Sequence, residues 1–379
     1  MSPKAVVDEA LLDLFLSSVG PREALRDALV HLVVNHAKLD VSSVISVRYD
    51  AGTLGSMLNV GPLGVGTILL GNNSFKSYKT MVGEIKKQLA AASKAGPKKA
   101  TAVPAGVLSA AKDQEAAVKF DAAKLSDARS IRIVQGLAGG VPNGKWDAET
   151  VRHVAAKQQA LGKGADGKID EATLEAFVNE LLASFEQEAV LQLIVDWYDL
   201  DRSHAYTLAY DQTFVATTAD EGSAETQRPF TAFGTGGIVK FGPAVFTKGF
   251  AGLVHTVAHE LGHIDQTFQG IQSDDVREFL SESVELVSSG MPTESMESLA
   301  DIDALTAGKR PADPGFLDDA VSALGHWLAM SAAEQKANSA RFVQVRGIVL
   351  GRIAREATAA QQARLKKFVE RWKAAPDGT

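Results

Sequence analysis

The chain has 379 residues, 45% of them hydrophobic, which is enough for two or three domains that each bury a core. It contains no cysteine, so disulfides, thiolate metal clusters and cysteine nucleophiles are excluded, and any metal ion must be held by histidines and carboxylates. The formal net charge of -7 provides no broad basic field for nucleic acid or anionic lipid, and we expect neither partner.

The first segment, MSPKAVVDEALLDLFLSSVG, predicts an amphipathic helix. Asp8, Glu9 and Asp13 interrupt its apolar run, whereas a signal peptide needs an uninterrupted apolar segment after a basic start. No stretch of the chain reaches the roughly 18 uncharged apolar residues of a membrane span. We therefore expect a protein that is cytoplasmic at synthesis, has no signal peptide or membrane span, and is exported only by a dedicated secretion or injection system.

Residues 91–106, AASKAGPKKATAVPAG, combine small residues, prolines and lysines without an apolar period, which predicts a linker. A helix is expected at 108–125. Linker and helix together occupy 93–128 and separate an N-terminal unit, residues 1–92, from the rest of the chain.

Residues 129–183 contain a turn-and-helix signal twice, as NGKWDAET and DGKIDEAT. Each Asn-Gly or Asp-Gly pair predicts a tight turn that Trp146 or Ile169 anchors, and Asp147 and Asp170 are placed to cap the following helices. The stretch resembles the peptidoglycan-binding-like domain family, which implies a three-helix module and a peptidoglycan ligand. Asp147 and Asp170 stand where that family usually has glycine, so a spacer or docking bundle without glycan affinity is an equal alternative.

A larger internal repeat joins the two halves of the chain. The stretch LVVNHAKLDVSSVISVRYD (32–50) matches LIVDWYDLDRSHAYTLAYD (193–211) without a gap, and the match continues into TMVGEIKKQ (80–88) and TVAHELGHI (256–264). The residues opposite His259, Glu260 and His263 are then Gly83, Glu84 and Lys87. We expect residues 1–92 to be a degenerate copy that lacks the metal ligands and braces or inhibits its sibling.

The second copy begins a segment, residues 184–312, in which helix and strand patterns alternate. The patterns predict a helix at 185–200, strands at 204–215 and 229–241, and a helix at 247–270.

The last of these helices carries HTVAHELGHIDQ, in which His259 and His263 lie four residues apart. Both imidazoles therefore leave the same face of the helix, one turn apart, and can bind one ion. Two neutral imidazoles and one carboxylate suit Zn²⁺ and leave a position for a water whose pKa falls towards about 7. We expect Glu260, beside the first histidine, to be the general base that takes a proton from this water.

The third ligand must be an acid further along the chain, and each candidate lies in helical surroundings. The candidates are Glu278, Glu282, Glu285, Glu294 and Glu297. The segment ESLAD offers Glu297 with Asp301 four residues later on the same helical face. We choose Glu297 as the ligand and Asp301 as the acceptor that orients a ligating imidazole, with Glu282 open as an alternative ligand.

The sequence does not decide which side chain would donate a hydrogen bond to the negatively charged oxygen that forms during hydrolysis. The candidates are Tyr206, Tyr210, His255 and His326, and we interpret His255 as a packing histidine.

The combination of H-E-x-x-H with E-x-x-x-D resembles the gluzincin metallopeptidases, which include thermolysin. The fuller HELGHIDQ with ESLAD is similar to a metallopeptidase domain family found with extracellular contractile injection systems, with matches at Gln266, Glu297, Ala300 and Asp301. This resemblance covers residues 200–310. It implies a zincin-like catalytic domain that hydrolyses peptide bonds in a protein or peptide substrate, delivered as an effector or toxin of such a machine.

Residues 313–379 show apolar residues at helical spacing with charges of both signs, which predicts helices that pack on the catalytic domain. The sequence thus predicts an α+β protein with a degenerate zincin-like repeat, a three-helix module and a zinc metallopeptidase domain. Two alternatives stay open: a non-catalytic structural or cargo protein with a structural zinc ion, and a hydrolase of cell-wall peptides.

Overall fold

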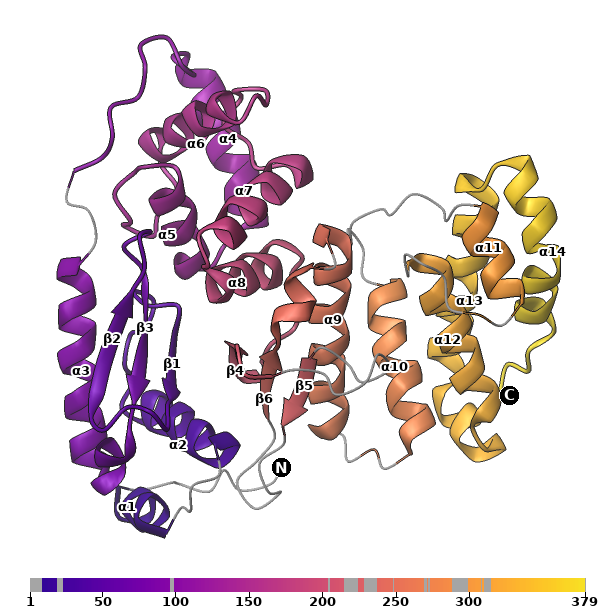
Figure 1. The fold of residues 1–379 in the computed structure, drawn as a ribbon, viewed down its shortest axis with the longest axis horizontal. Coiled ribbons are helices and arrows are strands. Elements are labelled where there is room, and N and C mark those ends of the chain that lie inside the picture. Colours follow the sequence, from indigo (N-terminus) through magenta and orange to yellow (C-terminus); the bar gives the residue numbers. More distant parts are fainter. Residues whose placement is uncertain are drawn as a thin grey trace. The chain divides into compact units, whose positions relative to one another are not determined.

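The computed structural model describes most of the chain. The described residues are 9–18, 23–95, 99–203, 205–214, 224–227, 237–247, 249–268, 271, 273–287, 299–307, 309 and 315–378. Within them the protein is α+β and mostly helical, with fourteen α-helices and short strands (Figure 1). None of the described helices is both long and apolar enough to cross a membrane.

The chain divides into two compact units. One comprises residues 1–214 and 227–241, and the other comprises residues 215–226 and 242–379. The division falls inside the expected domain 184–312. Most of its strand residues group with the N-terminal elements, whereas the helix that carries H-E-x-x-H groups with the C-terminal helices.

The first unit starts with a small α/β layer. Its elements are α1 (Glu9–Ser18), α2 (Glu23–His36), β1 (Ser46–Tyr49), β2 (Ser56–Val60), β3 (Gly66–Leu70), η1 (Asn72–Lys76) and α3 (Tyr78–Ala95). The strand order is β1-β3-β2, with β1 parallel and β2 antiparallel to β3. Every residue of the central strand β3 is buried, because apolar side chains of α1, α2 and α3 form one core with it.

The predicted linker begins later in the structure than in the sequence. Helix α3 continues to Ala95 because the AASKA stretch consists of residues that a helix tolerates well. Residues 99–110 are turns and irregular chain, as expected of a linker.

The helical module lies in the same unit. Its helices are α4 (Ala111–Lys124), α5 (Ala128–Leu137), α6 (Ala148–Ala160) and α7 (Glu171–Ala183). The predicted caps are confirmed: Asp147 Oδ1 accepts the N–H of Thr150 at 2.7 Å, and Asp170 Oδ1 accepts that of Thr173 at 2.8 Å. Each cap satisfies one of the free N–H groups at a helix start.

Two buried glutamines tie these helices to their turns in the same way. Gln135 Nε2 donates to Lys145 O at 2.9 Å, and its Oε1 accepts the N–H of Gly144 at 2.9 Å. In the next copy of the signal, Gln158 makes the equivalent pair of bonds with the backbone of Lys168 and Gly167, both at 2.8 Å. A side-chain amide thus satisfies backbone groups that the tight turn leaves without a partner in the backbone.

The remaining elements of the first unit follow the sequence prediction in part. They are α8 (Gln187–Trp197), β4 (Ala205–Tyr210) and β6 (Gly237–Phe241), with β5 (Ala224–Gln227) lying at the division between the units. Strands β4 and β6 pair in parallel. The predicted helix and the first predicted strand are present but shorter than expected. Of the second predicted strand, 229–241, only residues 237–241 are described, and they form β6; strand β5 was not predicted.

The second unit is helical. Its elements are η3 (Pro243–Thr247), α9 (Gly249–Phe268), α10 (Asp274–Val287), α11 (Leu299–Thr306), α12 (Phe316–Ala329), α13 (Ala332–Glu356) and α14 (Ala359–Ala374). The predicted helix at 247–270 is α9, and the predicted C-terminal helices are α12, α13 and α14. Their core contains Phe342 stacked between Trp327 and Trp372, at centroid distances of 4.1 and 5.7 Å.

Candidate metal centre

Helix α9, which carries the H-E-x-x-H motif, is mostly buried. Its apolar residues recur at helical spacing and are buried; they are Leu253, Val254, Val257, Ala258, Leu261 and Ile264. Gly249 starts the helix with a φ of +78°, a conformation that glycine adopts without strain. The apolar face holds the helix in place and thereby fixes the direction in which its histidines point.

The two motif histidines converge as predicted. His259 Nε2 and His263 Nε2 are 3.1 Å apart, and the rings meet edge to face with centroids 4.7 Å apart. Two imidazole nitrogens on one tetrahedral zinc ion, each about 2.0–2.1 Å from it, lie about 3.3 Å from each other. The observed separation is therefore close to what a shared ion requires.

A carboxylate from α10 completes a set of three. Glu278 Oε2 lies 3.6 Å from His259 Nε2, and Glu278 Oε1 lies 3.7 Å from His263 Nε2. These three side chains form one of the groups in the described chain whose ligand atoms all lie within 4.8 Å of one another. Glu278 is thus the described acid that faces both imidazoles.

The close approach of α10 to α9 depends on Gly262. A methyl group at this position would lie 3.2 Å from Ser281 Cα and 3.3 Å from Ser281 Oγ. Gly262 lies one residue before His263, so this close contact between the two helices is adjacent to the site.

The other nitrogen of each imidazole is also engaged. His259 Nδ1 lies 3.0 Å from Glu285 Oε1, and His263 Nδ1 lies 3.1 Å from Ser281 Oγ. Partners of this kind fix the ring orientation of a metal-binding histidine and leave its Nε2 towards the ion. Both partners come from α10, which supplies the acid as well.

The acids around the two imidazoles favour positive charge at this site. Burial lowers the pKa of His259, but hydrogen bonds to Glu278 and Glu285 outweigh burial and raise this pKa well above its ordinary value. The same hydrogen bond from His259 lowers the pKa of Glu278. Acids thus surround the imidazoles and favour a cation among them.

The predicted general base, Glu260, is a buried residue of α9 with 8% of its surface exposed. Ionisable side chains are rarely buried to this degree without a structural or functional role. It directly follows His259 and so lies on the turn of the helix that carries this histidine.

Two predicted residues lie at or beyond the limits of the described chain. Glu297 is outside the described residues. Asp301 belongs to α11, but its side chain is outside the described part. The alternative ligand Glu282 is buried on α10, in a second group of ligand atoms with His259 and Glu285.

His255, interpreted from the sequence as a packing histidine, lies among acids. Its Nδ1 is 3.2 Å from Asp319 Oδ2 on α12. Burial lowers the pKa of His255, but interactions with Asp319 and Glu285 raise it above its ordinary value. Burial raises the pKa of the neighbouring Glu282, as do the charges of Glu285 and Asp319.

Of the other three candidate oxyanion donors, His326 has a described relationship to the site. Its Nδ1 lies 3.0 Å from Asp275 Oδ1, and its charge contributes to lowering the pKa of Glu278. Tyr206 and Tyr210 belong to the first unit, on β4.

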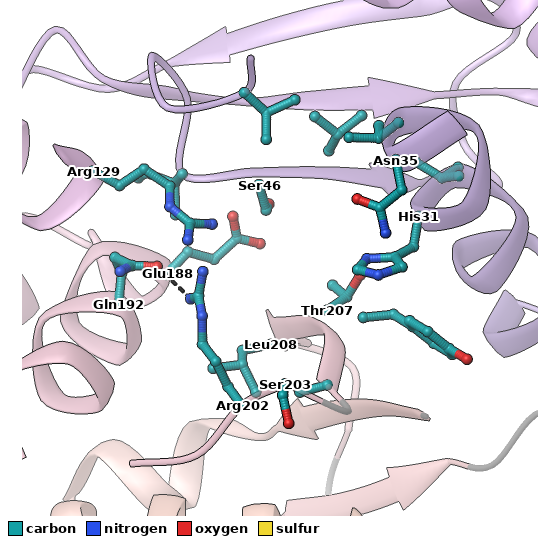
Figure 2. A pocket seen from close by; sticks show the side chains of 17 residues that line it. His31, Asn35, Ser46, Arg129, Glu188, Gln192, Arg202, Ser203, Thr207 and Leu208 are labelled. Atoms are coloured by element: carbon teal, nitrogen blue, oxygen red, sulfur yellow. Dashed lines mark hydrogen bonds between the residues drawn. The ribbon is translucent and has the colours of Figure 1, made fainter. Parts of the chain in front are cut away.

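A cavity of about 350 Å³ in the first unit is lined by α2, β1, α8 and β4 (Figure 2). Charged side chains that line it already have partners: Glu188 Oε1 lies 3.0 Å from Nη2 of Arg48, and Arg202 Nη1 donates to Gln192 Oε1 at 2.6 Å. These pairs hold α8 to its neighbours. The groups of described side chains suited to a metal ion all lie on α9, α10 and α12 instead.

Comparison with known proteins adds no assignment: no family model, curated protein or solved structure matches this chain.

Proposed function

We propose that the protein is a zinc-dependent metallopeptidase in which His259, His263 and Glu278 hold the ion. The observation that carries this proposal is the convergence of two Nε2 atoms, 3.1 Å apart, with one carboxylate 3.6 and 3.7 Å from them. Three such ligands leave a fourth position for water or substrate, which is the arrangement of catalytic rather than structural zinc sites.

In this proposal Glu278 is the third ligand, the role predicted from the sequence for Glu297. It approaches both imidazoles, and its own helix also supplies Glu285 and Ser281, the partners of the two Nδ1 atoms. In this proposal Glu285 orients His259, the role expected from the sequence for Asp301.

Zinc, when bound here, supplies a Lewis acid that polarises the scissile carbonyl and lowers the pKa of water. Glu260 is the base in our proposal: its carboxylate takes a proton from the attacking water and returns it to the leaving amide nitrogen. Glu285 and Ser281 keep both rings in the orientation that binding requires. The substrate class is a peptide bond in a protein or peptide.

The variant Glu260→Gln tests this function. We expect it to keep zinc and to lose about 10²- to 10⁴-fold in hydrolysis of an unstructured protein such as casein. Glu370→Gln, an exposed acid on α14, is the matched control and should keep both. Unchanged hydrolysis in Glu260→Gln would refute the assigned base, and zinc-loaded protein without any hydrolysis would favour the structural-zinc alternative.

Zinc content distinguishes the two candidate ligands. Glu278→Gln should lose zinc during dialysis against a weak chelator, whereas Glu297→Gln should retain it. The reverse result would restore Glu297 as the ligand. We measure zinc per chain by mass spectrometry of the dialysed protein.

The resemblance to the gluzincins and to the metallopeptidase family of contractile injection systems supports an effector delivered by such a machine, and we propose that role. A cell-wall hydrolase is the competing peptidase. Incubation with purified sacculi separates them, because release of peptide fragments from sacculi but not from casein would favour the cell-wall substrate. Binding of the protein to purified sacculi tests whether residues 129–183 bind peptidoglycan, as their resemblance implies.

We also propose that residues 23–95 and 187–268 are copies of one unit. Both segments run helix, three strands, 3-10 turn and helix, with the first strand parallel to the third. Lys38 and Asp199, which the alignment places opposite each other, both have positive φ, 48° and 51°. Two residues later in each copy, an aspartate side chain accepts the N–H of a serine, at 2.9 and 2.8 Å.

The structure supports a different register for the last helix of the repeat. Helices α3 and α9 each begin two residues after the end of the 3-10 turn, at Tyr78 and Gly249. Counting from these starts places Gln88, Leu89 and Ala92 opposite His259, Glu260 and His263. In this register, as in the sequence alignment that places Gly83, Glu84 and Lys87 there, the first copy lacks both imidazoles, which supports a role without metal.

A further inference from the structure

A second cluster of ionisable side chains lies one helical turn before His259. His255 on α9 has its Nδ1 3.2 Å from Asp319 Oδ2 on α12 and 3.8 Å from Glu285 Oε2 on α10. Ligand atoms of these three residues all lie within 4.8 Å of one another. We call His255, Glu285, Asp319 and the adjacent Glu282 the inner cluster.

The inner cluster is buried and rich in acids. The side chain of Glu285 is 5% exposed and that of His255 is 13% exposed. Glu282 is also buried, with 9% of its surface exposed. Glu282 Oε2 has no hydrogen-bond partner among the described residues, and His255 Nδ1 faces Asp319 Oδ2 at 3.2 Å without the geometry of a hydrogen bond. A buried carboxylate oxygen that can bind a cation is thus shielded from water and left without a hydrogen bond.

The charges of the cluster do not balance. Even with a protonated imidazole, its three carboxylates carry an excess of negative charge when ionised. A buried charge without a compensating partner is strongly unfavourable, because the interior does not replace the solvation that the charge loses. The cluster therefore has to take up protons or bind a cation, and a divalent cation would satisfy the unpaired oxygen as well as the charge.

Glu285 can serve both groups of side chains at once. Its Oε1 faces His259 Nδ1 at 3.0 Å, while its Oε2 faces His255. Ligation through Oε2 would leave Oε1 free to orient His259. One imidazole with carboxylates is a donor set that suits Zn²⁺ or Mn²⁺ better than Ca²⁺ or Mg²⁺, which prefer oxygen alone.

We propose that His255, Glu285 and Asp319, with Glu282 beside them, bind a second divalent cation, Zn²⁺ or Mn²⁺, next to the outer site of His259, His263 and Glu278. This inner site goes beyond the proposed peptidase activity and does not depend on it.

Metal stoichiometry of the full chain tests the inner site. The chelator-stripped protein is loaded with Zn²⁺ or Mn²⁺, freed of excess metal by gel filtration and analysed by mass spectrometry. We expect two equivalents in the unmodified protein, one in Asp319→Asn, one in Glu278→Gln and none in the double variant. No bound metal in the unmodified protein, or a folded Asp319→Asn that binds as many equivalents as the unmodified protein, would overturn the proposal.

Anomalous scattering from crystals of the unmodified, zinc- or manganese-loaded protein avoids the risk that a variant fails to fold. We expect a peak between His255 and Asp319, separate from any peak between His259 and His263. A map with only the outer peak would overturn the inner site. A map with only the inner peak would support it and count against the proposed peptidase, so the two proposals fail in distinguishable ways.

Discussion

Gly262 on α9 packs directly against Ser281 on α10, because the glycine has no side chain. A methyl group on Gly262 would lie only 3.2 Å from Ser281 Cα. This contact sets how closely α10 packs on α9. Since α10 also carries Glu278 and Glu285, the same contact fixes where the acids meet His259 and His263.

Gly262→Ala should therefore damage both packing and metal binding. The added methyl group pushes against backbone, and we expect this overpacking to cost about 1–3 kcal/mol, more than the gain of up to about 1 kcal/mol in helix propensity, and to weaken zinc binding. Gly325→Ala on α12 is the control, because a methyl group there meets nothing within 4 Å. Replacing an open helical glycine by alanine stabilises by up to about 1 kcal/mol. Equal effects of both variants in denaturant unfolding would contradict the role of the contact.

Glu285→Gln tests the orientation of His259. The change removes the negative charge that accepts from His259 Nδ1 but keeps the size of the side chain. Loss of such a partner typically weakens metal binding about 10- to 100-fold, and we expect a weakening in this range. Competition with a chromophoric chelator measures it. Glu370→Gln, exposed on α14, should leave the affinity unchanged; an unchanged affinity in Glu285→Gln would show that the Nδ1 contact does not matter.

Gln158→Ala tests the turn network of the helical module. The variant leaves the N–H of Gly167 and the carbonyl of Lys168 without their side-chain partner. Each buried group left unpaired costs about 1–3 kcal/mol. Two groups lose their partner, so we expect a destabilisation of about 2 kcal/mol or more. Its exposed neighbour gives the control: Gln159→Ala should change the free energy of unfolding by less than about 0.5 kcal/mol. Similar thermal stability of both variants would rule out the network as a stabilising feature.

Asp121 should make the stability of the protein depend on pH. Burial raises the pKa of this carboxyl from 3.8 to about 7, although Oδ1 accepts the N–H of Ile169 at 2.8 Å. Because the folded state holds the proton more tightly, the contribution of Asp121 is fully present below pH 3.8 and is lost as the pH rises to about 7. The loss amounts to about 1.4 kcal/mol per pH unit within this window.

Asp121→Asn removes this titration while keeping an oxygen acceptor for Ile169. The free energy of unfolding of the variant, minus that of the unmodified protein, should therefore rise between pH 4.5 and pH 6.5 by about 1.4 kcal/mol per unit. Urea unfolding at several pH values measures the difference. Asp27, whose pKa burial also raises to about 7, is present in both proteins and cancels. A difference that stays constant with pH would mean that Asp121 is ionised throughout.

Local features of the fold could be predicted from the sequence. The caps Asp147 and Asp170 follow from turn chemistry, and the convergence of His259 and His263 follows from helical spacing, so both predictions needed only a few neighbouring residues. Strand β5, AETQ, escaped prediction because it lacks alternating apolar residues.

The third side chain of the proposed site depends on tertiary packing, and the sequence offered Glu278 only as one of five candidate acids. Glu278 reaches the imidazoles only because α10 packs on α9 beside Gly262, a contact that no local pattern encodes. The useful signal was the spacing of Glu278, Glu282 and Glu285, which places three acids on one face of a helix. Considered as one stripe rather than as separate candidates, they indicate a helix whose acidic face meets the histidines.

Glu285 stands between two imidazoles that point at different oxygens of one carboxylate. A positive charge gained at His255 therefore weakens the interaction of Glu285 with His259. Binding on the two sides of this carboxylate is therefore interdependent, and thermodynamic reciprocity requires each side to alter the affinity of the other by the same factor. A cation bound beside His255 would then change the affinity of His259 and His263 for a cation of their own.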